Sequence, residues 1–289
     1  MTQKNSEFDS LVPAVGFDRR SFVVTALGAG FAMAMQPSLA QTTIKTDSEG
    51  LVVGQIKVAV ADGEMVAYRA APAGNTKAPV VLVISEIFGV HEYIADVCRR
   101  LAKLGYMAIA PELFARYGDP RTLKTIPEIR DQIISKMPDA VIMTDLDACV
   151  AWAGKNGGDA ARTAITGFCW GGRVTWLYAA HNPSLKAGVA WYGRLDDPTN
   201  ALTPKHPLDL AAEIKAPVLG LYGSADQGIP VADVESMNTE LKKAGGKSMI
   251  HLYDGAPHAF HADYRPSFRK ETAEDGWKRM LAWFKANGV

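Results

Sequence analysis

The strand-to-helix junction that decides the fold reads Gly167-Phe168-Cys169-Trp170-Gly171-Gly172. Residues 163–166 before it read as a short strand, and residues 173–180 after it have the apolar spacing of a helix. A turn of the form G-x-nucleophile-x-G crowds the backbone, so its flanking positions must be small. The turn also lifts one side chain above the carboxyl edge of a sheet. The stretch therefore predicts an α/β fold with Cys169 as a nucleophile; the simpler alternative is a small buried cysteine in a glycine-rich turn.

A nucleophilic cysteine needs a base, and the base needs an orienting carboxylate. Both candidates follow Cys169 in the order acid and then histidine, which is the order in α/β-hydrolases. Asp226 ends the segment Ser224-Ala225-Asp226 that follows an apolar strand at residues 216–223, and His258 lies in the loop after a strand at residues 249–253. The pattern predicts a triad of Cys169, Asp226 and His258, although Asp226 could also be an ordinary turn residue.

Two other histidines and a metal site are the alternatives at this end of the chain. His261 is the rival to His258 as the base, whereas His251 lies inside a strand and is expected to be structural. A metal site of His258, His261 and Asp263 has no further ligand cluster to support it and would leave the glycine-rich turn unexplained. We therefore expect no metal and no cofactor.

The remaining sequence alternates strands and helices. Strands are expected at residues 51–60, 64–70, 80–84, 107–110, 164–168, 188–192, 218–222 and 248–253, and helices at residues 91–104, 140–153, 231–243 and 270–287. Such alternation predicts a mostly parallel, doubly wound sheet with right-handed crossovers, and the Asp62-Gly63 pair predicts a hairpin between the first two strands. The poorly periodic residues 116–138 are expected to form a flap beside the site.

Composition favours one globular domain without a charged partner. Lysine plus arginine and aspartate plus glutamate each number 31, so nothing points to nucleic acid or anionic lipid. Three cysteines cannot form a disulfide framework, although a Cys98–Cys149 bond is conceivable. Residues 41–289 have the length of a single domain, and we expect a monomer.

The N-terminus carries a second signal. Asp18-Arg19-Arg20-Ser21-Phe22-Val23 resembles a twin-arginine export motif, and the apolar run from Val23 to Met35 is too short to span a bilayer. Small residues at Ser38 and Ala40 suit a signal peptidase. We predict a signal peptide over residues 1–40, recognised by the export machinery and cleaved after Ala40. The mature protein would then be periplasmic, without stable membrane association; an uncleaved anchor or a degenerate amphipathic leader is the alternative.

Four motifs make the chain from about Gly54 onward resemble the dienelactone hydrolases (carboxymethylenebutenolidases), a cysteine-using branch of the α/β-hydrolase fold. They are residues 86–90 (EIFGV), residues 110–116 (APELFAR), the turn at residues 167–172 (GFCWGG) and residues 257–260 (PHAF). The resemblance implies a single-domain α/β-hydrolase fold and hydrolysis of a small-molecule ester or lactone through an acyl-cysteine.

The resemblance also implies a role for Glu86. In this family the glutamate of the EIFG motif accepts the thiol proton when substrate binds. A free thiol is mostly protonated at neutral pH, and a nearby carboxylate disfavours a permanent thiolate. Two backbone N–H groups, at Trp170 and Ile87, are expected to form the oxyanion hole.

Arg116 matches the family arginine that pairs with an acidic substrate, because a guanidinium binds a carboxylate through two parallel bonds. The chain departs from the family at Ala262, where the prototype has a second arginine; Arg265, three positions further on, is the candidate replacement. Trp170 also fills a position that is smaller in the prototype.

Three other functions compete with a narrow dienelactone hydrolase. The first is a broader carboxylesterase or thioesterase. The second is a thiol redox protein that uses Cys169 alone, which the lack of a C-x-x-C partner disfavours. The third is a non-catalytic binding protein, which the complete set of triad residues disfavours. Fold by itself does not decide among these functions.

Overall fold

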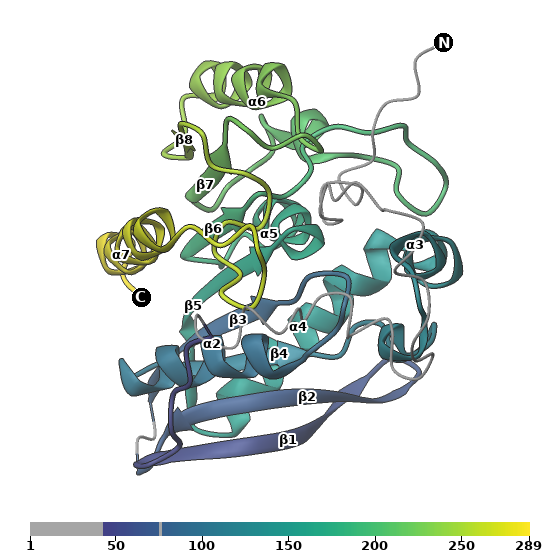
Figure 1. The fold of residues 1–289 in the computed structure, drawn as a ribbon. Helices are drawn as coiled ribbons and strands as arrows, with labels where there is room; N and C mark the ends of the chain where they lie inside the picture. Colours follow the sequence, from purple (N-terminus) through teal and green to yellow (C-terminus); the bar gives the residue numbers. More distant parts are fainter. Residues whose placement is uncertain (1–42, 75–76) are drawn as a thin grey trace, which may run out of the picture.

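The computed structural model describes residues 43–74 and 77–289, and the signal peptide predicted over residues 1–40 lies outside the described residues. Within the described part, eight strands form one sheet at the centre of the molecule (Figure 1). They are β1 (Leu51–Val60), β2 (Gly63–Pro72), β3 (Ala78–Ile84), β4 (Met107–Pro111), β5 (Gly158–Phe168), β6 (Ala187–Trp191), β7 (Val218–Gly223) and β8 (Met249–Tyr253).

The strand order in the sheet is β1-β2-β4-β3-β5-β6-β7-β8. β1, β2 and β4 pair in antiparallel fashion, whereas every pair from β4 through β3 to β8 is parallel. The carboxyl ends of the parallel strands therefore meet at one edge of the sheet, where ligands bind in open α/β sheets. The expected mostly parallel, doubly wound architecture is confirmed.

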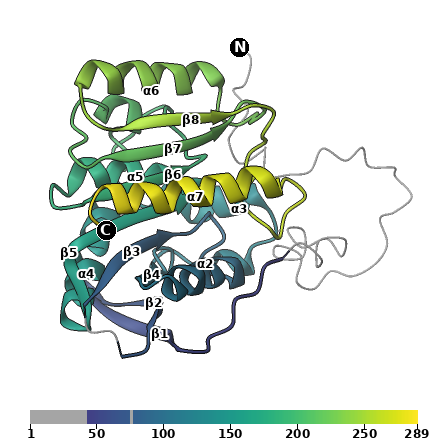
Figure 2. The same ribbon diagram turned by 90° about the vertical axis from the view of Figure 1, so that its left-hand side faces the viewer.

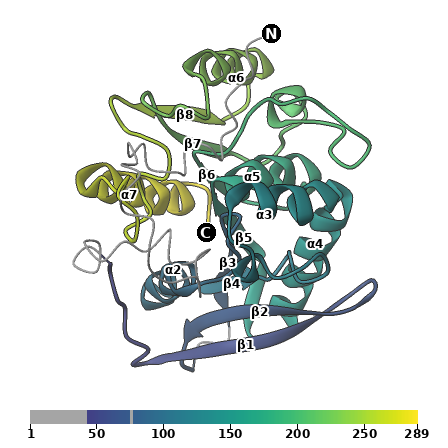
Figure 3. The ribbon, with the colours of Figure 1, turned by 45° about the vertical axis from the view of Figure 1, so that its right-hand side comes forward.

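Helices cover both faces of this sheet. They are α2 (Glu92–Lys103), α3 (Ile126–Gln132), α4 (Asp139–Lys155), α5 (Trp170–His181), α6 (Val231–Ala244) and α7 (Lys270–Ala286). Figures 2 and 3 show α2 and α7 on one face and α4 and α5 on the other. α2 buries Ile94, Val97, Cys98 and Leu101, a helical spacing that directs one apolar stripe onto the sheet. The main core therefore lies on both sides of β3, β5 and β6.

Two segments contain regular structure that the sequence pattern did not predict. Residues 116–138 contain α3 and two short 3-10 helices, at Pro120–Thr122 and Ile134–Lys136. Thr125 and Glu128 form a reciprocal capping box that starts α3, a local signal that outweighs the weak apolar periodicity. β5 begins six residues earlier than residue 164, because Gly158 and Asp159 also pair with β3 before a register shift.

The described part of the chain holds no helix that is both long and apolar enough to cross a membrane. Cys98 and Cys149 are free thiols in the core, so the conceivable disulfide between them is not formed.

Candidate active site

Cys169 lies at the sharp turn between β5 and α5, with φ of 54° and ψ of −117°. Glycine is required around it, because a Cβ at Gly167 would lie 2.1 Å from the carbonyl oxygen of Gly171. At Gly172 a Cβ would lie 2.5 Å from the carbonyl oxygen of Trp191, the residue that accepts a hydrogen bond from the Cys169 N–H (3.0 Å). The backbone therefore has the tight strand–turn–helix geometry that the sequence predicts.

Backbone strain gathers at this edge of the sheet. In the described part of the chain, the non-glycine residues with positive φ are Cys169, Tyr192 and Ala259. Tyr192 follows β6, and Ala259 directly follows His258. Such conformations cost free energy and persist mainly where function or dense packing demands them.

His258 and Asp226 form a buried pair. His258 Nδ1 lies 2.6 Å from Asp226 Oδ2, and both side chains are only 1% exposed. The other oxygen, Asp226 Oδ1, accepts hydrogen bonds from the N–H groups of Gly228 (2.9 Å) and Ile229 (3.2 Å). The carboxylate is therefore held from two sides, and it orients the imidazole with Nε2 as the remaining ring nitrogen.

His261 is engaged elsewhere. Its Nδ1 lies 2.6 Å from the hydroxyl of Tyr93, and its ring stacks on Phe168 and on Trp277. Burial, with a smaller contribution from the charge of Arg100, lowers the pKa of His261 well below its ordinary value. The structure thus pairs His258, and not His261, with Asp226.

Glu86 is fully buried at the end of β3. The hydroxyl of Tyr264 donates a hydrogen bond of 2.5 Å to its Oε2, and His91 Nε2 lies 3.7 Å from the same oxygen. Burial by itself would raise the pKa of Glu86, but the imidazole of His91 and the charge of Arg265 outweigh it and lower the pKa. Oε1 is buried and accepts no hydrogen bond from the described residues.

Arg265 reaches this site. Its guanidinium lies 5.5 Å from the ring centre of Phe88 and 5.8 Å from that of Tyr264, within the range of cation–π contacts. Burial by itself would lower the pKa of Arg265, but Tyr264, Glu86 and Cys169 outweigh burial and raise this pKa. The ring of Tyr192 lies beside His258, with ring centres 5.1 Å apart. Burial first, and then the charges of Glu86 and Cys169, raise the pKa of Tyr192 well above the ordinary value.

The two backbone groups expected to form the oxyanion hole are both available. In the described part of the chain, neither the Ile87 N–H nor the Trp170 N–H donates to a backbone carbonyl. Trp170 is the first residue of α5, where the helix dipole favours negative charge. Its indole packs against Phe114, with ring centres 4.9 Å apart, which directs its bulk toward the APELFAR segment.

Arg116 is paired with two carboxylates. Its Nε lies 2.6 Å from Asp62 Oδ2 at the tip of the β1–β2 hairpin, and a second ion pair joins it to Asp145 on α4. The substrate-binding role of Arg116 stays a prediction, and these ion pairs do not favour it.

Three residues near Glu86 were not identified from the sequence: His91, Tyr192 and Tyr264. Tyr192 carried a usable signal, because it ends an expected strand at the active edge. His91 and Tyr264 carried none beyond proximity to the EIFGV and PHAF motifs. In the described part of the chain, no group of three His, Cys, Asp or Glu side chains is arranged to hold a metal ion.

The neutral state of His261 predicts a pH-dependent stability. The unfolded chain binds a proton near pH 6.5, whereas folded His261 resists it, so the free energy of unfolding should fall as pH drops below about 6.5. His261→Gln should remove most of this loss; smaller parts should remain, since burial also lowers the pKa of His206 and His251. Urea unfolding midpoints between about pH 5 and pH 8 measure the effect. A slope in His261→Gln equal to that of the wild type would contradict the assignment to His261.

Comparisons with known proteins identify the family of the chain. Residues 65–288 match the model of the dienelactone hydrolase family. A protein of Methylorubrum extorquens named "Putative carboxymethylenebutenolidase" is 57% identical over 290 residues, covering 100% of both chains. One of the same name from Escherichia coli strain K12 is 50% identical over 267 residues, which covers 92% of this chain and 98% of the relative.

A solved structure is also similar. The crystal structure of a "Putative Dienelactone Hydrolase" from Klebsiella pneumoniae superposes with a TM-score of 0.80 at 52% identity, and covers 81% of this chain and 98% of that chain. The family model matches most of the chain, and the two relatives are 57% and 50% identical to it. The chain therefore belongs to the dienelactone hydrolase family and is an enzyme that hydrolyses ester or lactone bonds.

Proposed function

We propose that this enzyme hydrolyses a small-molecule ester or lactone through an acyl-cysteine on Cys169, with His258 as the base and Asp226 as its orienting carboxylate. The observation that carries the proposal is the buried 2.6 Å contact between His258 and Asp226 at the sheet edge where the strained Cys169 turn opens. Nucleophile, base and orienting acid on one edge are the parts that acyl transfer requires.

In the first half of the reaction, Glu86 accepts the thiol proton when substrate enters. The thiolate of Cys169 attacks the carbonyl carbon, a C–S bond forms, and the carbonyl electron pair moves onto oxygen. The N–H groups of Ile87 and Trp170 stabilise this oxyanion; each such donor contributes about 2.7–4 kcal/mol in acyl-transfer enzymes.

The oxyanion then collapses and the ester C–O bond breaks, which completes the acylation half of the reaction. The proton taken from the thiol reaches the leaving oxygen through His258, and an acyl-cysteine remains. Water then attacks the acyl carbon while His258 accepts its proton. The C–S bond breaks, and the sulfur of Cys169 regains a proton from His258.

The substrate class has two candidates. The family resemblance favours an acidic dienelactone. A broader carboxylesterase or thioesterase is the second. It is favoured by the ion pairs of Arg116 and by the cation–π contacts of Arg265, whose charge also interacts with Glu86. Both arginines that would bind a substrate carboxylate already interact with protein groups.

A substrate comparison tests the proposal. The purified protein is assayed with a dienelactone, a p-nitrophenyl ester and an acyl thioester, and the reaction is quenched in acid for mass spectrometry. We expect hydrolysis of at least one substrate and an acyl mass on the peptide that contains Cys169. Hydrolysis without any acylation of Cys169 contradicts the acyl-cysteine, and the ratio of kcat/KM values separates the narrow from the broad activity.

We also propose export of the protein to the periplasm. The support is the twin-arginine-type motif at residues 18–23 and the small residues before position 41. Both lie outside the described residues, so the leader over residues 1–40 stays a prediction. The monomeric state, which no observation tests, also stays a prediction.

A further inference from the structure

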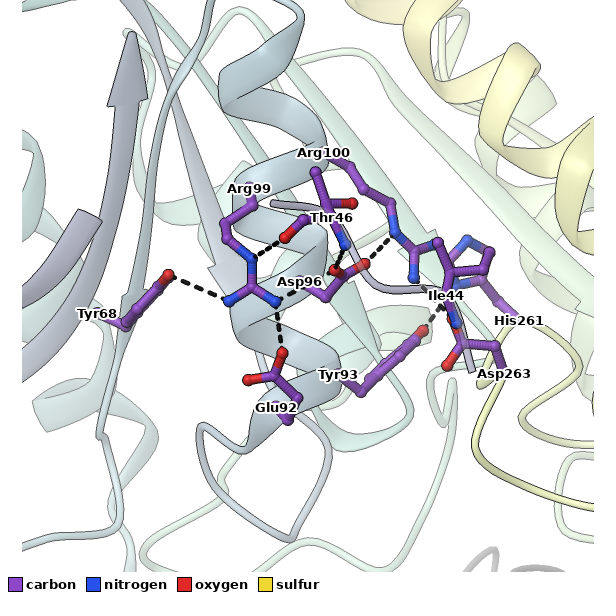
Figure 4. A network of polar contacts seen from close by, with 10 residues as sticks. All are labelled: Ile44, Thr46, Tyr68, Glu92, Tyr93, Asp96, Arg99, Arg100, His261 and Asp263. Carbon is purple, nitrogen blue, oxygen red and sulfur yellow. Dashed lines mark hydrogen bonds and ion pairs between the residues drawn. The ribbon is translucent and has the colours of Figure 1, made fainter. Parts of the chain in front are cut away.

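Residues 43–49, which we name the strap, connect the start of the described chain to β1 and run along α2 (Figure 4). The Thr46 N–H donates to Asp96 Oδ1 (2.5 Å), and Arg99 Nε donates to the Thr46 carbonyl (2.8 Å). Further along, Lys103 Nζ donates to Asp47 Oδ1 (2.6 Å). These contacts attach the strap to α2 alone.

One strap contact reaches a different element. The Ile44 N–H donates to Oδ2 of Asp263, in the loop that follows His258 (3.3 Å). The same Oδ2 accepts from Arg100 of α2 (2.6 Å), and Arg100 also contacts Asp96 (2.5 Å). Both carboxylates are 1% exposed, and a buried ion pair holds its partners strongly because either charge left unpaired is costly.

Apolar packing does not hold the strap in place. The side chain of Ile44 is 45% exposed. The strap also borders a cavity of about 700 Å³, whose other walls include His261 and residues of α7 such as Trp277 and Lys278. The polar contacts to Asp96 and Asp263 therefore determine where the strap lies.

Asp263 is directly followed by Tyr264, which contacts Glu86, and by Arg265, whose charge acts on it. Tyr264 donates 2.5 Å to Glu86 Oε2, and the charge of Arg265 acts on both Glu86 and Cys169. Along this loop, Asp263 faces α2 and the strap, while its neighbours face the candidate active site. A shift of the backbone at Asp263 consequently moves Tyr264 and Arg265 as well.

We propose that the strap and the Arg100–Asp263 ion pair form a clasp that holds Tyr264 and Arg265 against Glu86, so that Asp263 is a positioning residue for the thiol chemistry of Cys169. The inference rests on the proposed function of Glu86 and Cys169. It gives the segment just beyond the predicted leader a part in completing the site, since the clasp closes only when residues 44–46 lie along α2.

The test compares Asp263→Asn with the matched control Lys103→Met in the full chain. Asp263→Asn removes the charge that faces Arg100 and the better acceptor for the Ile44 N–H. Lys103→Met breaks a contact of the same strap with α2 and touches nothing in the loop. The measurements are kcat and KM for a p-nitrophenyl ester, the urea midpoint, and the rate of Cys169 alkylation by iodoacetamide as a function of pH.

We expect Asp263→Asn to lower kcat by about 10-fold or more at nearly unchanged KM, because a displacement of about 1 Å in a positioned group can cost 100-fold. Its alkylation profile should move to higher pH, since the charge of Arg265 no longer lies beside Cys169. Lys103→Met should keep kcat and the alkylation profile of the wild type within about 2-fold, whatever its stability. The clasp would be overturned if Asp263→Asn kept the wild-type kcat and the wild-type alkylation profile, while both variants lost the same amount of stability.

Ile44→Pro supplies a second test should Asp263→Asn fail to fold. It removes the N–H that donates to Asp263 and leaves both buried charges paired. A smaller change in the same direction, in kcat and in the alkylation profile, supports the clasp, and wild-type values of both contradict it. Failure of the proposed function is recognised separately, because wild-type hydrolysis would then proceed without acylation of Cys169.

Discussion

We expect Cys169→Ala to abolish ester and lactone hydrolysis and to leave the fold intact. The substitution removes only the thiol of Cys169, and without this thiol no acyl-enzyme can form. We therefore expect kcat to fall by about 10⁴-fold or more. The change removes little core volume, and alanine keeps the backbone of the turn as strained as cysteine does. Initial rates with the best substrate and a thermal melt of both proteins measure the two parts of the prediction.

The matched control is Cys149→Ala, which removes a buried thiol on α4 away from the site. This variant should keep wild-type turnover. Substantial esterase activity in Cys169→Ala would remove the central claim about the nucleophile, whereas equal losses in the two variants would indicate a general effect on the fold.

Glu86→Gln should lower kcat by about 10²–10⁴-fold, the usual contribution of a positioned acid or base. The lowered pKa of Glu86 keeps it ionised near neutral pH, so the wild-type carboxylate can accept the thiol proton. An amide of the same shape cannot accept this proton, although its oxygen can still accept the hydrogen bond of Tyr264. Cys169 should remain present and open to alkylation in the variant.

Alkylation by iodoacetamide distinguishes this mechanism from an ordinary cysteine–histidine pair. With a gated thiol, the free wild-type enzyme reacts slowly near neutral pH, because an idle thiol is mostly protonated there. Fast alkylation of the wild type well below pH 7 would contradict the gated thiol. His258 would then be the base that ionises the resting thiol, and the hydrolase assignment would stand. Glu92→Gln, on the exposed side of α2, is the control and should behave as wild type.

Local patterns in the sequence predicted much of the sheet and of the candidate site. Cys169 directly follows β5, and Asp226 and His258 lie in the loops that follow β7 and β8. The carboxyl ends of parallel strands meet at one edge of a sheet whatever the course of the loops. The sequence also predicted the tight turn from the glycines around Cys169, because such a turn excludes larger residues by local sterics alone. The short helix at Ile126–Gln132 was missed, since its start depends on a capping box and not on apolar periodicity.

The surroundings of Glu86 could not be predicted in this way. Tyr264 is 178 positions from Glu86 in the chain and donates to it at 2.5 Å, and Asp263 is 219 positions from Ile44. Arg116 and Arg265 were equal candidates by residue type, yet one pairs with Asp62 and Asp145 and the other lies beside Glu86.

The sequence by itself determined the order of strands and helices, the turn at Cys169 and the chain order of nucleophile, acid and histidine, because each depends on residues close together in the chain. Only the tertiary structure decided which charged and hydroxyl groups surround the carboxylate of Glu86. Those contacts depend on the courses of long loops and on which buried charges find partners, and both are settled by the packing of the whole chain and not by local propensity.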